Sequence, residues 1–334
     1  MRKLAVVLFL CAALLLLGCS QPDLPLKATP SPSATPAYSP TTAPSVTATP
    51  SSTPVPTPTP RPEVWKNGGA VISGKYADAE VVDAGDGAYR MYYSAEPEVA
   101  GFEGQMYSAT SRDGIAWVPE GKMLKTWAVT PSVSKLQDGR YRLYFGNQGV
   151  IKSALSNDGL SWTDEDGVRA DTANSEGLAL ESVVSPTVLH DGSEYILVYR
   201  GTVNQRYSPE VPNSNTQLFF WAVSKDGVTF EKKGIALDSR NAAFNGLVDG
   251  PELVKWDDGS IRLYFWSYKG AYHTTFGNGT FSQDAVLDYT TNLNPMAPFS
   301  ENPPSDPALA KINNTWFMYY GQHTKGIYYA ILGR

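Results

Sequence analysis

Cysteine, histidine and clusters of positive charge are all scarce in this chain of 334 residues. The two cysteines, Cys11 and Cys19, both lie in the first 19 residues, so no disulfide bond can stabilise the rest of the chain. The three histidines lack the His-x-x-x-His spacing of a helical metal site, so the sequence indicates no metal centre. The formal net charge is −6 and no cluster of Lys or Arg occurs, which argues against a nucleic-acid partner.

The first residues have the pattern of an export signal. Arg2 and Lys3 precede an apolar run over residues 4–17, which is short for a membrane span but has the length of a signal-peptide core. The run ends in Leu16-Leu17-Gly18-Cys19, which resembles a bacterial lipobox and implies cleavage before an acylated Cys19. Residues 1–18 are therefore predicted to be a lipoprotein signal peptide, and we expect a lipid-anchored protein on the extracytoplasmic side of the cell envelope. An ordinary secretory signal with an incidental cysteine is the alternative.

Residues 19–62 are predicted to form the lipid anchor and a stalk. From Ala28 to Pro62 the chain is almost entirely Pro, Thr, Ser and Ala, and this composition cannot bury enough apolar surface to fold. Its prolines favour an extended conformation, which would hold the folded part away from the membrane. Residues 63–334 remain, and about 270 residues suffice for one large all-β domain.

Five copies of one strand pattern fill this folded part. Each copy has a short apolar strand, a tight turn with Asp-Gly or Asn-Asn, and a second strand rich in Tyr. Repeats of roughly 40–50 residues with about four strands each are typical of a β-propeller, so we predict an all-β, five-bladed β-propeller. The second residue of each first strand lies 13 positions before an aromatic residue, in the pairs Ala79 and Tyr92, Pro131 and Tyr144, Pro186 and Tyr199, Pro251 and Tyr264, and Pro307 and Tyr320.

A second turn pattern marks the outer part of the blades. Ser111-Arg-Asp-Gly-Ile-Ala-Trp117 has counterparts at residues 156–162 and 224–230, and predicts a hairpin between the third and fourth strands. Its Asp is expected to form local turn hydrogen bonds rather than a ligand site.

The fifth copy contains only three strands before Arg334. Residues 64–72, which precede the first copy, repeat the pattern of a fourth strand. We therefore predict that this N-terminal strand completes blade five and closes the ring, which pairs the edge strands that would otherwise be exposed.

These features together resemble the five-bladed propeller glycosidases of glycoside hydrolase families 43, 32, 68, 62, 117 and 130. The resemblance rests on the five repeats, the Asp-Pro-like strand openings, the Ser-x-Asp-Gly-x-x-Trp turns and Asp249-Gly-Pro251, and it covers residues 63–334. It implies an enzyme that acts on glycosidic bonds of arabinan, xylan, fructan or mannoside type. A non-catalytic glycan-binding lipoprotein and a platform for protein partners are the alternatives.

The geometry of a propeller predicts where a site forms, because first strands begin at the face to which second strands return. Glycoside hydrolysis needs two carboxyl groups, and crowding of carboxylates raises the pKa of at least one of them, as a proton donor requires. Asp78, Asp249 and Asp306 fall on three cyclically adjacent blades and are the predicted catalytic residues. The predicted sugar-binding residues around them are Glu80, Glu96, Asn147, Gln148, Arg200, Glu252, Trp266 and His323.

The match to the family pattern is incomplete. By resemblance, Asp249 takes the place of the general acid of family 43, and Asp78 and Asp306 resemble its base and its pKa-modulating aspartate. In the family order, however, the partners of an acid at Asp249 would fall at Thr130 and Ser185, which cannot take up a proton from water. A rearranged hydrolase or phosphorylase and a protein that only binds glycans therefore both remain as hypotheses.

Two long loops, at residues 96–104 and 201–216, are expected on the same face. Loops carried by a rigid ring commonly hold binding residues, so Phe102, Arg206 and Tyr207 are further candidates for sugar contacts. No cofactor is indicated with certainty; some members of the resembling families hold a central cation, and the resemblance leaves room for one. The expected partners are carbohydrate and membrane lipid, and we expect a monomer.

Overall fold

The computed structural model describes residues 63–173, 176–291, 299–300 and 302–333. Within these ranges the chain forms 21 β-strands and no helix, and the strands form five antiparallel sheets. The predicted signal peptide at residues 1–18, the lipidation site at Cys19 and the stalk up to residue 62 lie outside the described residues. No helix in the described part of the chain is long and apolar enough to cross a membrane.

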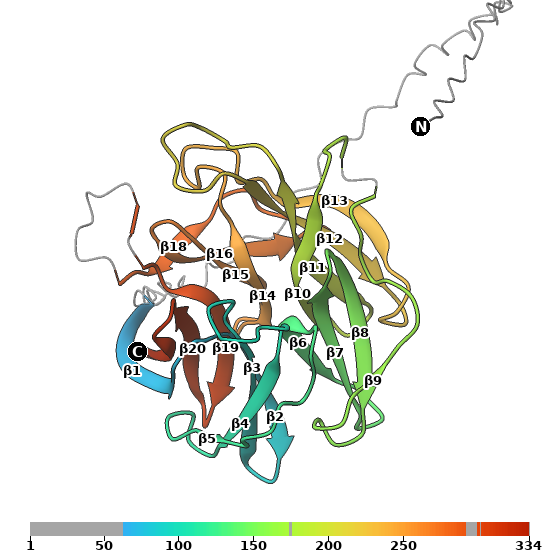
Figure 1. Cartoon of the computed structure of the whole chain (residues 1–334), viewed down its shortest axis with the longest axis vertical. Coiled ribbons are helices and arrows are strands. Elements are labelled where there is room, and N and C mark those ends of the chain that lie inside the picture. The colour runs from blue at the N-terminus through green and yellow to red at the C-terminus, as the bar shows by residue number, and fades with distance from the viewer. Residues whose placement is uncertain (1–62, 174–175, 292–298, 301, 334) are drawn as a thin grey trace, which may run out of the picture. The chain divides into compact units, whose positions relative to one another are not determined.

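Each sheet is one blade, and the blades surround a common centre (Figure 1). Blade one contains β2 (Tyr76–Gly85), β3 (Ala88–Ala95), β4 (Met106–Ser111) and β5 (Val118–Pro119). Blade two contains β6 (Val129–Lys135), β7 (Tyr141–Asn147), β8 (Val150–Ser156) and β9 (Thr163–Asp164). Blade three contains β10 (Ser182–His190), β11 (Tyr195–Val203), β12 (Thr216–Ser224) and β13 (Glu231–Leu237).

The last two blades depart from this plain order. Blade four contains β14 (Asp249–Lys255), β15 (Ile261–Ser267), β16 (Gly270–Gly277), β17 (Thr280–Phe281) and an additional strand, β18 (Val286–Tyr289), which pairs with β16. Blade five contains β19 (Ser305–Ile312), β20 (Thr315–Gln322), β21 (Gly326–Gly333) and β1 (Val64–Ser73). The sequence repeat did not predict β18 as a separate strand; in blades one and two only the isolated pairs Met106–Lys125 and Ile151–Ala170 occupy its place.

The first strands of the blades form the inner wall of the ring. β2 contacts β6, β6 contacts β10, β10 contacts β14, β14 contacts β19, and β19 contacts β2 again. Each of these strands lies at one end of its sheet and pairs on one side only within its blade. The prediction of a five-bladed propeller is confirmed.

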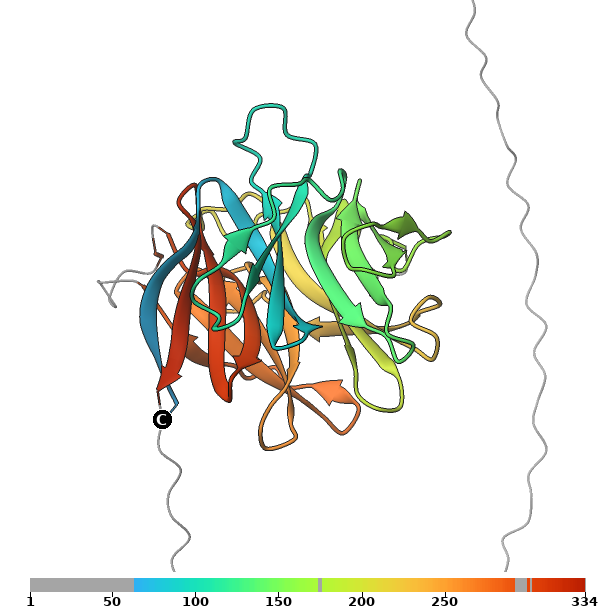
Figure 2. The same ribbon diagram turned by 90° about the horizontal axis from the view of Figure 1, so that it is seen from below.

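The N-terminal strand closes the ring, as predicted. β1 pairs with β21 over its whole length, from Val64 opposite Gly333 to Ser73 opposite Gly326, so the blue and the red ends of the chain share one sheet (Figures 1 and 2). Glu63 extends the closure to blade four, because its carboxylate accepts hydrogen bonds from Trp256 Nε1 (3.1 Å) and Arg262 Nη1 (2.8 Å). Trp65 and Ile72 of β1 are buried against blades four and one.

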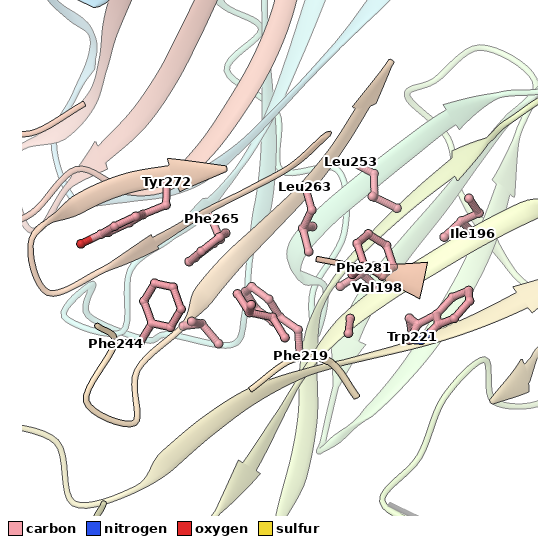
Figure 3. Packing of buried hydrophobic residues seen from close by; sticks show 13 residues of the cluster. Ile196, Val198, Phe219, Trp221, Phe244, Leu253, Leu263, Phe265, Tyr272 and Phe281 are labelled. Atoms are coloured by element: carbon pink, nitrogen blue, oxygen red, sulfur yellow. The ribbon is translucent and has the colours of Figure 1, made fainter. Parts of the chain in front are cut away.

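The hydrophobic core lies between the blades rather than within them. Five clusters of buried side chains each join two neighbouring blades. In the cluster between blades three and four, Phe219 and Trp221 of β12 face Leu263 and Phe265 of β15 (Figure 3). Burial of each such side chain contributes about 1.5–3 kcal/mol, so the blades stabilise one another and a blade alone would not.

Tyrosines of the second strands bind the outer turn of the following blade. The hydroxyls of Tyr319, Tyr92 and Tyr144 donate to the carbonyl oxygens of Gly114 (2.7 Å), Gly159 (2.9 Å) and Gly227 (2.8 Å). These tyrosines are fully buried, so each of them packs between two blades.

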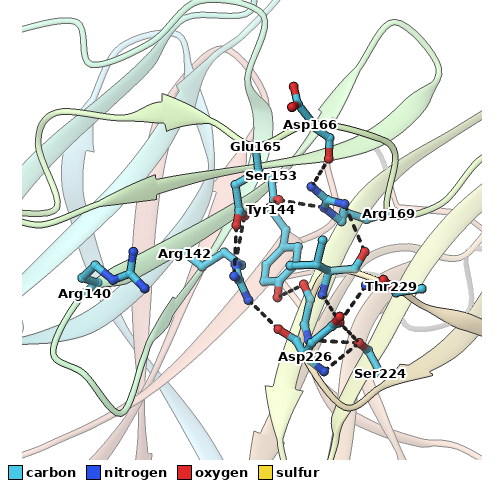
Figure 4. Close-up of polar contacts among 12 residues, drawn as sticks. Arg140, Arg142, Tyr144, Ser153, Glu165, Asp166, Arg169, Ser224, Asp226 and Thr229 are labelled. Atoms are coloured by element: carbon cyan, nitrogen blue, oxygen red, sulfur yellow. Dashed lines mark hydrogen bonds and ion pairs between the residues drawn. The ribbon is translucent and has the colours of Figure 1, made fainter.

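The aspartates of the outer turns act locally, as predicted. The carboxylate of Asp226 accepts hydrogen bonds from the backbone N–H groups of Val228 and Thr229, both at 2.8 Å, and from the hydroxyl of Ser224 (Figure 4). These donors lower the pKa of Asp226. In the same region Arg142 binds Glu165 and the carbonyl oxygen of Asp226, so the turn also links blades two and three.

Two hairpins differ from the predicted spacing. In blade one, Glu80 lies opposite Tyr92, but in blade three Thr187 lies opposite Val198 and in blade five Ala308 lies opposite Tyr319. The first hairpins of blades three and five are thus one residue shorter, and the residues equivalent to Tyr92 are Val198 and Tyr319. Tyr199 and Tyr320 fit the spacing in the sequence, but each lies one position beyond the residue that is equivalent to Tyr92.

We expect that removal of residues 1–73 abolishes cooperative folding, because it exposes the edge of β21 and removes Trp65 and Ile72 from two inter-blade clusters. A chain that starts at residue 63 serves as the control, since it keeps β1. Thermal unfolding followed by circular dichroism compares the two. Equal melting temperatures would show that ring closure by β1 is dispensable.

Candidate functional site

A β-bulge opens the innermost strand of every blade. In blade one, Ala77 lies opposite Ser94 and the next pair is Glu80 opposite Tyr92, so β2 has one more residue than β3 between these two pairs. The other four blades have the same extra residue. The bulged residue has a positive φ in all five blades, which re-aims its side chain. These residues are Asp78 (φ 54°), Thr130 (50°), Ser185 (51°), Gly250 (57°) and Asp306 (47°).

The residue after each bulge faces the axis of the ring. Proline occupies this position in four blades, which is tolerated because the innermost strand is a sheet edge and needs no ladder hydrogen bond there. A narrow cavity of about 30 Å³ lies at the axis, with room for about one water molecule. Its lining includes Ala79, Pro131, Pro186, Pro251, Pro307 and the carboxyl groups of Glu80 and Glu252.

A wide cavity of about 570 Å³ shares four of the five bulged residues with this narrow one, all except Gly250, and its volume is typical of small-molecule sites. The starts of first strands and the ends of second strands meet in its wall, as predicted. Seven predicted site residues line it: Asp78, Asp249, Asp306, Glu96, Arg200, Trp266 and His323. The prediction missed Asn302, Pro303 and Ser305, which follow a segment that carries no repeat pattern.

Two of the three aspartates have raised pKa values. Burial raises the pKa of Asp306 well above its usual range, and the negative charges of Asp78 and Asp249 raise it further. Burial, followed by the charge of Asp249, raises the pKa of Asp78 to about 6. The structure thus brings together carboxyl groups that come from three different blades.

Asp249 has a different environment, because hydrogen-bond donors surround its carboxylate. Arg200 forms an ion pair with it, and both side chains are largely buried, at 19% and 13% exposure. The hydroxyl of Ser185 donates to Oδ1 (3.2 Å), and so does the backbone N–H of Gly250 (2.8 Å). These three donors hold the carboxylate of Asp249 in a fixed position.

The glycine after Asp249 permits the close approach of Asp306. A Cβ atom at position 250 would lie only 2.5 Å from both Cα and Oδ1 of Asp306, and the φ of +57° disfavours other residues as well. On its other side, Asp306 accepts a hydrogen bond from Trp266 Nε1 (3.2 Å). Gly250 and Trp266 therefore position Asp306 against the cavity.

A second set of side chains, further along the innermost strands, links four of these five strands to the next one. Each accepts a hydrogen bond from a backbone N–H of the following blade. The pairs are Glu80 with Val133 (3.2 Å), Ser132 with Val188 (3.2 Å), Thr187 with Leu253 (2.9 Å), and Glu252 with Leu309.

Glu80 and Glu252 therefore have a structural contact, although both were predicted to bind sugar. They line the narrow cavity rather than the wide one, and their side chains hydrogen-bond to each other. Burial raises the pKa of Glu80 to about 8; burial and the charge of Glu80 raise the pKa of Glu252 well above its usual range. The pair is thus built to hold a proton at neutral pH, and the same oxygens could hold the central cation that the resemblance leaves room for.

The rim of the wide cavity carries a set of groups that could bind a metal ion. Ligand atoms of Glu96, Glu98 and His323 lie within 4.8 Å of one another. The two ring nitrogens of His323 lie 3.5 Å from Glu96 and 3.4 Å from Glu98, while the carboxylate of Glu96 also accepts the backbone N–H of Thr324 (2.8 Å). Contact between loops of blades one and five accounts for this arrangement without a metal.

Several candidates lie apart from both cavities. Asn147 and Gln148 do not line either of them, and Asn147 donates to the carbonyl oxygen of Trp127 (2.9 Å). Phe102 lines the wide cavity, whereas Arg206 and Tyr207 do not. A sugar-binding role of Asn147 and Gln148 stays a prediction.

Solved structures of glycoside hydrolases share this fold. A family 130 structure, described as belonging to mannoside phosphorylases that include hydrolases of β-1,2-mannosidic linkages in Candida mannan, has 14% identity and a TM-score of 0.55, covering 80% of this chain and 94% of its own. A family 43 enzyme of Xanthomonas citri complexed with xylose has 15% identity and a TM-score of 0.54, covering 80% and 90%. A glycosyl hydrolase of Bacteroides ovatus has 14% identity and a TM-score of 0.54, covering 77% and 84%.

At these identities the likeness establishes the fold, which is the five-bladed propeller of these glycoside hydrolases, as the sequence resemblance implied. No family model and no curated protein matches the sequence.

We expect stability to decrease with rising pH because of Glu80 and Glu252. The pKa of Glu80 is raised from 4.5 to about 8 in the folded state, so between these pH values the folded chain binds more protons than the unfolded chain. Stability is highest below pH 4.5 with respect to this group and falls until about pH 8, at about 1.4 kcal/mol per unit of pKa shift. Denaturant unfolding between pH 5 and 8 measures this slope.

The variant Glu80→Gln keeps a side chain of the same size and a hydrogen-bond acceptor for Val133 while it removes one titrating group. Its slope should be shallower than that of the wild type over the same range. Parallel slopes in the two proteins would contradict a proton held by the pair.

Proposed function

We propose that this protein is a glycoside hydrolase-like enzyme that cleaves glycosidic bonds in oligo- or polysaccharides. The observation that carries the proposal is the unlike environment of carboxyl groups in one cavity. Asp306 is partly buried and has a raised pKa, whereas Asp249 is paired with Arg200. Carboxyl groups whose surroundings separate their protonation states are suited to act as acid and base in one reaction.

The environments suggest a division of roles that differs from the family order. Asp306 is the proton donor, which protonates the glycosidic oxygen as the bond to the anomeric carbon breaks. Asp249 is the carboxylate that either accepts a proton from the attacking water or attacks the anomeric carbon itself. The pKa of Asp78 is about 6, and its negative charge helps to keep Asp306 protonated.

The substrate class follows from the wall of the wide cavity. Carboxylates, Arg200 and the indole of Trp266 offer hydrogen-bond partners and an apolar surface, which suits a hydroxylated ring. Sugars of arabinan, xylan, fructan or mannoside type are the proposed substrates, in keeping with the mannan and xylose that the names of two structural neighbours mention.

The proposed location is the extracytoplasmic side of the cell envelope. The charged and apolar start of the chain, the lipobox-like sequence before Cys19 and the proline-rich stalk support a lipid-anchored protein. Such a protein would meet polysaccharide outside the cytoplasm, with membrane lipid as its second partner and the monomer as its working form.

A non-catalytic glycan-binding lipoprotein is the second candidate. It is favoured by Thr130 and Ser185, which occupy bulge positions equivalent to Asp78 and Asp306 but cannot take up a proton. The ion pair between Arg200 and Asp249 also engages one of the three carboxylates.

We expect that Asp306→Asn lowers the rate of hydrolysis at least about a hundredfold, because it removes the proton donor and leaves the fold intact. Asp249→Asn should do the same by removing the paired carboxylate. The measurement is the release of products from xylo-, arabino-, fructo- and mannooligosaccharides, followed by chromatography. Asp284→Asn, which changes an exposed carboxylate outside both cavities, is the matched control and should keep full activity.

The two candidate functions give different results in this assay. An enzyme loses turnover in the Asp306 and Asp249 variants and still binds its substrate. Micromolar binding of a glycan by the wild type without any turnover would instead support the binding protein, and the absence of both binding and turnover would contradict both candidates.

A further inference from the structure

Trp127 is a large aromatic residue in an unusual backbone conformation on the surface. Its side chain is 51% exposed, and its φ is +55°. A bulky residue in the left-handed region is a conformational outlier that costs free energy, and such outliers are concentrated at functional sites.

Neighbouring segments hold Trp127 in place. Its backbone N–H donates to the carbonyl oxygen of Glu103 (2.8 Å), and its own carbonyl accepts from Asn147 Nδ2 (2.9 Å). The next residue, Ala128, donates to Gly104 (3.0 Å), where an added Cβ would lie 3.4 Å from the Cα of Trp127. The exposed indole is therefore carried by a fixed backbone and not by a free loop tip.

The position of Trp127 is next to the wall of the wide cavity. Val129, two residues further along the chain, lines that cavity. Phe102 also lines it, is 37% exposed, and directly precedes the residue that binds the backbone of Trp127. The rim between blades one and two thus carries two exposed aromatic residues, one in the cavity wall and one just outside it.

The fold does not require an aromatic residue at this position. The corresponding residues, three positions before the bulge in the other four blades, are Lys75, Ser182, Leu247 and Pro303. None of these is aromatic, and none has a positive φ. Packing of the propeller blades therefore does not explain why an exposed tryptophan occupies this position.

We propose that Trp127 is an outer sugar-binding subsite, on which a glycan chain stacks where it leaves the wide cavity. One face of a sugar ring presents C–H groups, which pack against the face of an indole without the need for a charged partner. A side chain already fixed in its binding conformation loses little entropy on binding. This proposal rests on the proposed function and adds that the preferred ligands are chains longer than the cavity itself holds.

The test compares ligands of two lengths. Xylo-, arabino-, fructo- and mannooligosaccharides of two and of six sugar units are offered to the full chain, with kcat/KM measured where cleavage occurs and Kd by calorimetry where it does not. Trp127→Asn removes the ring and keeps a residue that tolerates positive φ. We expect this variant to bind or process the six-unit sugar about tenfold less well, with the two-unit sugar unchanged.

Two further variants serve as controls. Trp127→Phe keeps an aromatic face and should restore most of the preference for the longer sugar. Ile115→Ala removes a large apolar residue that is 44% exposed in the turn between β4 and β5 and does not line the wide cavity, so it should change neither ligand. Thermal unfolding of each variant checks that the propeller is still folded.

The outcomes separate the subsite from the proposed function. If Trp127→Asn changes neither ligand, or both equally, the subsite is wrong while the proposed function stands, and a contact of Trp127 with a protein becomes the better explanation. If the wild type binds none of the four series, both proposals fail.

Discussion

The β-bulge at the start of each innermost strand is the constraint on which the site depends. An innermost strand without it would alternate its side chains between the two faces of its sheet, toward the neighbouring blades. The bulge breaks this alternation at one residue, and the five bulged residues all line the narrow cavity at the axis. Residues as distant in sequence as Asp78 and Asp306 interact electrostatically for this reason.

The five blades use one backbone geometry for different chemistry. Asp78, Thr130, Ser185, Gly250 and Asp306 have nearly the same φ, yet they comprise two acids, two hydroxyl residues and a glycine. The catalytic candidate of blade four is therefore displaced to Asp249, where Arg200 and Ser185 can reach it. A repeat that makes the ring can thus supply a site without symmetry.

Carboxyl groups near the axis are compatible with a stable ring because each has a partner. Asp78 hydrogen-bonds to Ser94. Asp249 has Arg200, Asp306 has Trp266, and Glu80 and Glu252 share a hydrogen bond with each other while they bind backbone N–H groups of the next blades. An isolated buried charge would be far more costly than these paired or protonated forms. The large inter-blade clusters then keep these groups in fixed positions, which a site that relies on preorganised electrostatics needs.

The sequence by itself determined the ring, because five copies of a hairpin pattern with turn residues at regular positions leave a propeller as the arrangement that buries all sheet faces. It also determined the closure by residues 64–72, and the face on which Asp78, Asp249 and Asp306 meet. Only the tertiary structure decided the surroundings of these groups, since Arg200 reaches Asp249 from another blade and Gly250 has to make room for Asp306. The tertiary structure also separated Glu80 and Glu252 from the wide cavity and placed Trp127 beside it. Burial and contacts between distant segments depend on how the blades pack, so a local sequence pattern does not predict them.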